Sequence, residues 1–157
     1  MLIVTAKLDK RKIVGGLLAL LAIAALAVLV FGGGDRAEPA ASLTAPVRSN
    51  EQRVQYLKSL GWDVSQDPID TQTVTVPKDF SKVYADYNTL QKAQGFDLKK
   101  YAGLEATRYT YEVKNHPTAK GKVVADMIVY RGKVIAADVQ SLSADGGFME
   151  GVAFPKV

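Results

Sequence analysis

The feature that most restricts this chain is an uninterrupted apolar run at residues 13–31, IVGGLLALLAIAALAVLVF. The run contains no charged or polar side chain. At the rise of an α-helix, its nineteen residues would span about 28 Å, close to the bilayer hydrocarbon thickness of about 30 Å. A helix of this length in a soluble core normally carries a polar stripe. The run therefore predicts a transmembrane helix.

Basic residues indicate how this helix is oriented. Lys7, Lys10, Arg11 and Lys12 precede it, and the flank that follows it is weakly charged. Because positively charged flanks stay on the cytoplasmic side, we expect residues 1–12 to be a short cytoplasmic segment and the rest of the chain to lie outside the cell membrane. The alternative is a cleaved export signal, but the apolar region of such signals has only about 7–15 residues.

A spacer follows the apolar run. Residues 32–48, GGGDRAEPAASLTAPVR, are mostly small, contain proline and are poor in large apolar groups. Such a composition cannot form a core and predicts a flexible linker. We therefore expect residues 49–157 to form the extracytoplasmic domain, held clear of the membrane surface.

The distribution of charge excludes one class of function. The net charge is +4, but the excess lies mainly before the apolar run. Residues 49–157 contain 14 Lys and Arg against 13 Asp and Glu, so the domain offers no phosphate-binding field and we expect no nucleic-acid partner. The chain also has no cysteine, which excludes disulfides, thiolate nucleophiles and cysteine-ligated zinc.

The first helix of the domain has recognisable ends. Ser49 and Gln52 have the spacing of a capping box at the N-terminus of a helix. Gly61 is expected to end this helix in the left-handed conformation, which would place Trp62 against the helix. The only tryptophan of the chain is therefore assigned to the core rather than to a ligand site.

A second amphipathic helix is expected at residues 80–94. Asp79 is positioned to cap its N-terminus, and Gly95 to end it. Aromatic and aliphatic side chains recur through it at helical spacing, which indicates one apolar side. Asp97 is predicted to cap a short turn that follows and that ends at Gly103.

The remaining elements are strands. Alternating or β-branched runs predict them at residues 71–76, 104–114, 122–130 and 133–142. Arg131 and Gly132 are expected to form a two-residue hairpin loop. We expect the last three strands to form an antiparallel meander with the first strand at an edge. The predicted fold is α+β: a two-layer domain in which two amphipathic helices cover one face of an antiparallel sheet of about four strands.

The order of motifs resembles a known family. The chain contains VTAKLDKRK before the apolar run, NEQRVQYLKSLGWDV after the spacer, and then VTVPKDFSKVYADYNTLQKAQGFDLKKYAG, TRYTYEV, VYRGKVIAADVQS and GGFMEG. These stretches resemble a bacterial family of small membrane-anchored proteins catalogued as a domain of unknown function, number 4830. The resemblance covers the apolar run and nearly all of residues 50–151. It implies a membrane-anchored topology and, because the family has no known activity, no catalytic or binding residue.

Two aspartates on the last predicted hairpin are the strongest candidates for chemistry. If the hairpin pairs regularly about its two-residue loop, Asp126 faces Ala137 and Asp138 faces Ala125, so the carboxylates lie on opposite faces of the sheet. Each would then be an acid on a largely apolar face, and we expect each to form local hydrogen bonds or to be exposed to water at a sheet edge. A glycosidase needs two carboxylates about 5–10 Å apart in one site. Convergence of this pair, or of either aspartate with Glu105 or Glu112, would favour a hydrolase.

The only histidine, His116, precedes a proline in a polar stretch. One imidazole without a second histidine at metal-binding spacing does not predict a zinc site. No nucleophile elbow accompanies it to indicate a Ser-His-Asp triad. We therefore interpret His116 as a solvated loop residue, assign no catalytic or metal-binding residue, leave the binding residues open and expect no cofactor.

Three functions remain open for this chain. The first is a non-catalytic extracytoplasmic binding or interaction domain, anchored in the lipid bilayer through residues 13–31. The second is a cell-envelope hydrolase that uses carboxylates. The third is an accessory subunit of a membrane complex, because the glycines and alanines of the apolar run permit close helix approach. We favour the first and expect the protein not to be an enzyme, since no catalytic constellation is found.

Overall fold

The computed structural model describes residues 45–119, 121–143 and 147–155. Among them, no helix is long and apolar enough to cross a membrane. The predicted membrane helix at residues 13–31 and most of the predicted linker lie outside the described residues. In chain order the elements are α2 (Asn50–Ser59), β1 (Asp70–Thr75), α3 (Lys82–Ala93), the 3₁₀ turn η2 (Leu98–Tyr101), β2 (Glu105–Val113), β3 (Val123–Tyr130), β4 (Lys133–Ser141) and β5 (Met149–Gly151).

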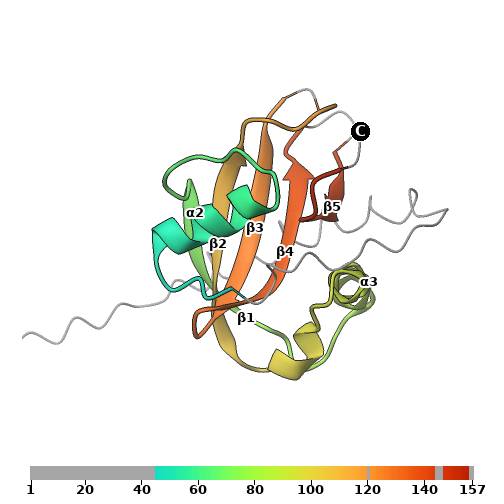
Figure 1. The fold of residues 1–157 in the computed structure, drawn as a ribbon. Coiled ribbons are helices and arrows are strands. Elements are labelled where there is room, and N and C mark those ends of the chain that lie inside the picture. Colours follow the sequence, from blue (N-terminus) through green and yellow to red (C-terminus); the bar gives the residue numbers. More distant parts are fainter. Residues whose placement is uncertain (1–44, 120, 144–146, 156–157) are drawn as a thin grey trace, which may run out of the picture.

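The strands form one antiparallel sheet in the order β1-β2-β3-β4-β5 (Figure 1). This order confirms the predicted α+β class, the meander of β2, β3 and β4, and the edge position of β1. The sheet has five strands rather than about four, because residues 149–151 add a short strand beside β4. Three residues are too few for a recognisable alternation of apolar and polar side chains.

The two helices cover opposite faces of the sheet, so the prediction that both cover one face was wrong. The α2 residue Leu57 packs in a cluster with Tyr111 and Met127. The α3 residue Tyr87 packs in a second cluster with Ile128. Met127 and Ile128 are consecutive on β3, and consecutive strand residues point to opposite faces. Since β3 and β4 are buried almost throughout, both faces of the hairpin need an apolar cover, which makes the domain three-layered.

Local signals set the ends of α2 as predicted. The Ser49 hydroxyl accepts from the Gln52 backbone N–H, and the Gln52 side chain accepts from the Ser49 N–H, which completes the capping box. At the other end Gly61 has φ +101°, and Trp62 N–H donates to the carbonyl of Leu57. Trp62 is only 1 % exposed. The prediction that this residue lies in the core is confirmed.

The start of α3 differs from the prediction. The N-cap is Ser81, whose hydroxyl accepts from the backbone N–H of Tyr84. Asp79 therefore lies outside the helix, which begins at Lys82. Both residue types are good caps, so composition alone does not choose between them. The predictions for Gly95 and Asp97 are confirmed. Gly95 follows the end of α3 with φ +91°, and the Asp97 side chain caps η2 by accepting from the Lys99 N–H.

The folded domain begins earlier than predicted, because Val47 belongs to it rather than to the linker. Val47 is fully buried and lies in the cluster under α2. Its backbone N–H also donates to the carbonyl of Gly132 in the β3–β4 turn, at 2.9 Å. A single valine in a stretch of small and polar residues does not stand out as a core residue. The end of the spacer is thus tied to the sheet.

We predict that a fragment starting at residue 45 folds on its own and that one starting at residue 49 is less stable. The shorter fragment loses a buried valine and one backbone hydrogen bond, which together contribute about 2–4 kcal/mol to the free energy of unfolding. Urea denaturation of both fragments measures the difference, with Val47→Ala in the longer fragment as an intermediate case. Equal stabilities would place Val47 outside the core.

Candidate functional site

The register of the β3–β4 hairpin brings the two candidate aspartates together. Next to the turn, Tyr130 pairs with Lys133 and Val129 with Val134, as regular pairing predicts. The register then shifts by one residue at Ile135, so that Asp126 pairs directly with Asp138. The prediction that these carboxylates lie on opposite faces was wrong, because a one-residue bulge moves the rest of β4 to the other face.

The pair is part of a row of polar residues across the sheet. Asp70, Thr110, Asp126 and Asp138 are directly opposite one another on β1, β2, β3 and β4. Directly opposed residues have Cα atoms about 4.5–5.5 Å apart, so their side chains are within reach of one another. We call these four residues the polar row. It lies on the face that α3 covers.

Asp126 has the partners of an ionised carboxylate. The Thr110 hydroxyl donates to its Oδ1, and Gln140 Nε2 donates to its Oδ2 at 2.6 Å. Burial raises the pKa of Asp126 above its ordinary value, and the Thr110 hydrogen bond, the nearby Arg108 guanidinium and the Gln140 hydrogen bond offset only part of that rise. Arg108 itself is paired with Asp70 at 3.4 Å. Two hydrogen-bond donors, Thr110 and Gln140, and the positive charge of Arg108 thus stabilise the ionised form of this carboxylate.

Asp138 has the environment of a protonated carboxyl. It is 1 % exposed, and the Tyr87 hydroxyl of α3 donates to its Oδ1 at 2.7 Å. Its Oδ2 has no hydrogen-bond partner among the described residues. Burial and then the charge of Asp126 raise the pKa of Asp138 well above its ordinary value. The arrangement therefore favours a shared protonation of the pair in which Asp138, with the stronger rise in pKa, is the more readily protonated carboxyl.

The carboxylate pair is closed to solvent in this structure. Asp126 is 5 % exposed and Asp138 1 %. Among the groups that cover them is the Tyr87 ring, whose own pKa is raised well above its usual range, first by burial. Glu105 and Glu112, the other acids considered, are exposed on β2, opposite Thr75 and Val124. The spacing therefore fits a carboxylate pair, but the surroundings are those of a buried core.

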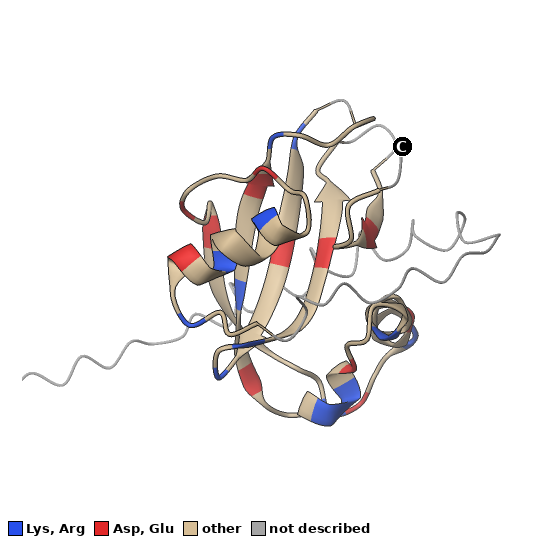
Figure 2. Ribbon diagram, in the orientation of Figure 1, with Lys and Arg blue, Asp and Glu red and all other residues tan. Residues whose placement is uncertain are grey.

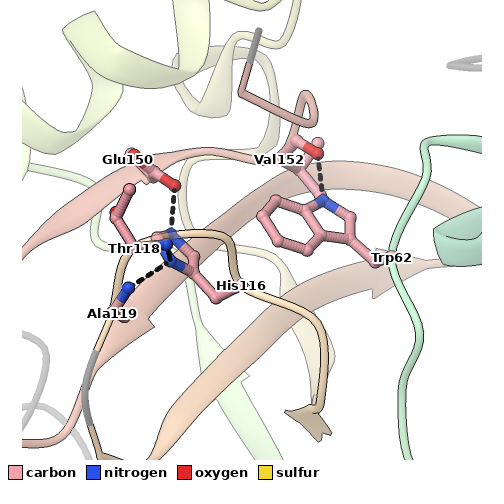
Figure 3. Close-up of polar contacts among 6 residues, drawn as sticks. All are labelled: Trp62, His116, Thr118, Ala119, Glu150 and Val152. Atoms are coloured by element: carbon pink, nitrogen blue, oxygen red, sulfur yellow. Dashed lines mark hydrogen bonds and ion pairs between the residues drawn. The ribbon is translucent and has the colours of Figure 1, made fainter. Parts of the chain in front are cut away.

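His116 lies in a second polar cluster, at the loop after β2, and is not the solvated residue that was predicted. Its side chain is 7 % exposed, and Nε2 is 3.0 Å from Glu150 Oε1 on β5 (Figure 3). Nδ1 accepts from the backbone N–H groups of Ala119 and Thr118, at 3.0 and 3.4 Å. Nδ1 therefore carries no proton, and Nε2–H donates to Glu150. Both ring nitrogens are in use.

Aromatic side chains enclose the imidazole and tie down the C-terminal segment. The His116 ring stacks on Trp62 with centroids 5.8 Å apart and also packs against the Phe148 ring, with centroids 4.9 Å apart. Trp62 Nε1–H donates to the carbonyl of Val152 at 2.6 Å, as Figure 3 shows. The cluster joins three distant segments of the chain. Its geometry is that of a structural anchor for the residues that follow β5.

Several residues of the site were not found from the sequence. Thr110, Arg108, Tyr87 and Gln140 were not singled out as site residues. The sequence signal that could have indicated them is the presence of polar residues within otherwise apolar strands, because a buried polar side chain needs a polar partner. Among the described residues, no group of three or more His, Asp or Glu side chains could hold a metal ion.

Comparison with known proteins gives one match. Residues 56–139 match a family described as Domain of unknown function (DUF4830). The match includes the end of α2, the strands β1 to β3, α3 and both aspartates of the pair. No curated protein and no solved structure matches the chain.

We predict that Asp138→Asn is at least as stable as the natural chain at pH 7 and that its advantage grows with pH. Folding raises the pKa of Asp138, so above its ordinary value of 3.8 the folded state binds more protons than the unfolded state. The stability of the natural chain therefore falls as pH rises toward the folded pKa. The amide keeps an acceptor for the Tyr87 hydroxyl and has no proton to lose.

Urea unfolding at pH 5 and pH 8 measures this difference. Asp138→Ala is the matched control, because it removes the acceptor for Tyr87 and leaves a gap, at a cost of about 1–3 kcal/mol relative to the amide. If the natural chain and Asp138→Asn change in parallel between the two pH values, the carboxyl at position 138 holds no proton in the folded state.

Proposed function

This chain belongs to the DUF4830 family, a domain of unknown function, and we propose that it is a non-catalytic binding or interaction domain tethered outside the cell membrane. In this proposal residues 1–12 are cytoplasmic, residues 13–31 cross the bilayer once, and residues 32–46 form the tether. The domain that starts at Val47 carries the function. The proposal requires no cofactor and no metal.

The tether is supported by the sequence. An apolar run of nineteen residues with four basic residues shortly before it and a weakly charged flank after it is typical of a signal-anchor with its C-terminal domain outside. The absence of cysteine is compatible with that location, because the domain has two apolar clusters, one on each face of the sheet, to stabilise it. A spacer of small residues and proline leaves the domain free to reach a partner.

The observation that carries the proposal is that the groups best suited to catalysis are used inside the domain. The only imidazole, His116, has one nitrogen bonded to Glu150 and the other to two backbone N–H groups. Asp126 accepts from Thr110 and Gln140, and Asp138 from Tyr87. Each of these contacts stabilises the fold. A substrate would have to displace them to reach the same atoms.

A second candidate function, a carboxylate-dependent hydrolase of the cell envelope, is favoured by one observation. Asp126 and Asp138 are directly opposed on one face, and burial raises the pKa of both, that of Asp138 more strongly because Thr110, Arg108 and Gln140 oppose the rise at Asp126. Two carboxyl groups with different protonation states are the acid and base that hydrolysis of a glycosidic bond needs. Their burial is the argument against it, since no substrate atom reaches a side chain that is 1 % exposed.

The topology and the function are tested with the full-length protein in cells. Protease added to intact or wall-stripped cells is expected to remove an epitope placed after residue 157, because the domain lies outside. An epitope that stays protected, or a mature chain that begins near Asp35, would contradict the anchored arrangement. In the same cells, the double variant Asp126→Asn, Asp138→Asn should keep every interaction of the natural protein. Loss of its cellular effect with the fold and the interactions intact would favour the hydrolase.

A further inference from the structure

The two edges of the sheet are protected to very different degrees. At the β4 edge, β5 pairs with residues 138–140. Where β5 ends, side chains of α3 take over: Ala137 N–H donates to Gln91 Oε1, and Gln94 Nε2 donates to the Ala137 carbonyl, both at 3.0 Å. Figure 1 shows α3 beside this edge. The β4 edge is therefore capped by a strand and by two amide side chains.

The other edge, formed by β1, has outward-facing backbone groups. The Val76 N–H donates to the Leu104 carbonyl, so the backbone of Val76 faces β2. Backbone groups of successive strand residues point alternately to the two sides in an antiparallel ladder. The N–H and C=O groups of Thr71, Thr73 and Thr75 therefore point away from β2. β1 is the last strand of the sheet, and no described segment pairs with its outer side.

This edge also lacks the usual devices that prevent pairing. Thr71, Thr73 and Thr75 have exposed side chains, and β1, DTQTVT, contains neither lysine nor proline. Exposed edge strands are normally blocked by lysine, proline or a covering segment, because they form a template for another strand. Threonine is well suited to strand pairing. Among the described residues, the β4 edge is covered by β5 and α3, whereas the outward backbone groups of Thr71, Thr73 and Thr75 are uncovered, so β1 is a ready acceptor for an extended chain.

The charge around β1 indicates the kind of chain. Figure 2 shows acidic segments on β1 and on β2 next to it. The acidic residues on and beside this edge are Asp63, Asp67, Asp70, Asp79, Glu105 and Glu112, and the bases are the exposed Lys78 and Lys114 and the buried Arg108, which is paired with Asp70. Two copies of this edge would bring like charges together. A partner strand that carries lysine or arginine would instead find complementary charge.

We propose that β1 is a docking strand for an extended, basic segment of a partner protein, which adds to the sheet as a sixth strand. The inference rests on the proposed function and specifies its binding surface. Backbone hydrogen bonds to Thr71, Thr73 and Thr75 hold the segment, and alternate lysine or arginine side chains lie near the acids of β1 and β2.

The test uses the full-length protein in detergent micelles and two synthetic probes, an alternating Lys–Val octapeptide and an alternating Glu–Val octapeptide. The expected result is binding of the Lys–Val peptide, measured by fluorescence anisotropy, with slower hydrogen exchange confined to residues 70–76 in mass spectrometry. The Glu–Val peptide should bind at least about tenfold more weakly, and added salt should weaken the Lys–Val complex.

Three variants show whether the backbone of β1 is responsible. Thr73→Pro removes an outward N–H without touching the ladder to β2, so binding should fall about tenfold or more. Thr73→Lys should also lose binding, through repulsion of the basic peptide, and serves if the proline variant is unstable. Thr73→Val keeps the N–H and the β-branched shape and should bind as the natural protein does.

Specific outcomes would overturn the inference. They are equal binding of both peptides, protection elsewhere in the domain, or binding unchanged in Thr73→Pro and Thr73→Lys. Concentration-dependent protection of residues 70–76 without any peptide would show that the occupant is a second copy. If the edge fails these tests while the double variant Asp126→Asn, Asp138→Asn still keeps its cellular interactions, the binding function stands and its surface lies elsewhere.

Discussion

One extra residue in β4 determines how the covered face of this domain is built. Ile128 pairs with Ala136, while Val129 pairs with Val134, so Ile135 has no partner across the hairpin. Ile135 and Ala136 both join the apolar cluster on the side of α3. Beyond this bulge every side chain of β4 points to the face opposite to the one that regular pairing predicts. That shift places Asp138 on the α3 side, directly opposite Asp126.

The fold can bury this pair of carboxyl groups only because neighbouring side chains form hydrogen bonds to them. An unpaired buried charge is costly, and two adjacent buried carboxylates cannot both ionise easily. Thr110 and Gln140 donate to Asp126, whereas the Tyr87 hydroxyl donates to Asp138. Since Tyr87 comes from α3, the same contact that accommodates the acid also fixes the helix on the sheet. The polar contacts of the pair thus hold the helix layer and the sheet together.

Local signals in the sequence predicted the local structure well. The capping box at Ser49, the glycine after each helix and the alternation in the strands all depend on neighbouring residues, and the structure confirms them. The bulge at Ile135 depends on packing against a distant helix, so the turn alone predicted the wrong register. His116 was assigned to solvent because its neighbours are polar, whereas Trp62 and Glu150, which bury it, are far away in the sequence.

The rise in the pKa of Asp138 beside Asp126 is the property on which this arrangement depends most. It is tested most directly by NMR of the carboxyl carbons in ¹³C-labelled protein, followed from pH 3 to pH 9, with Asp138→Asn to assign the resonances. The structure predicts that the Asp138 carbon stays at the chemical shift of a protonated carboxyl well above the ordinary pKa of 3.8. Two carboxyl carbons that both titrate near pH 4, independently of each other, would contradict it.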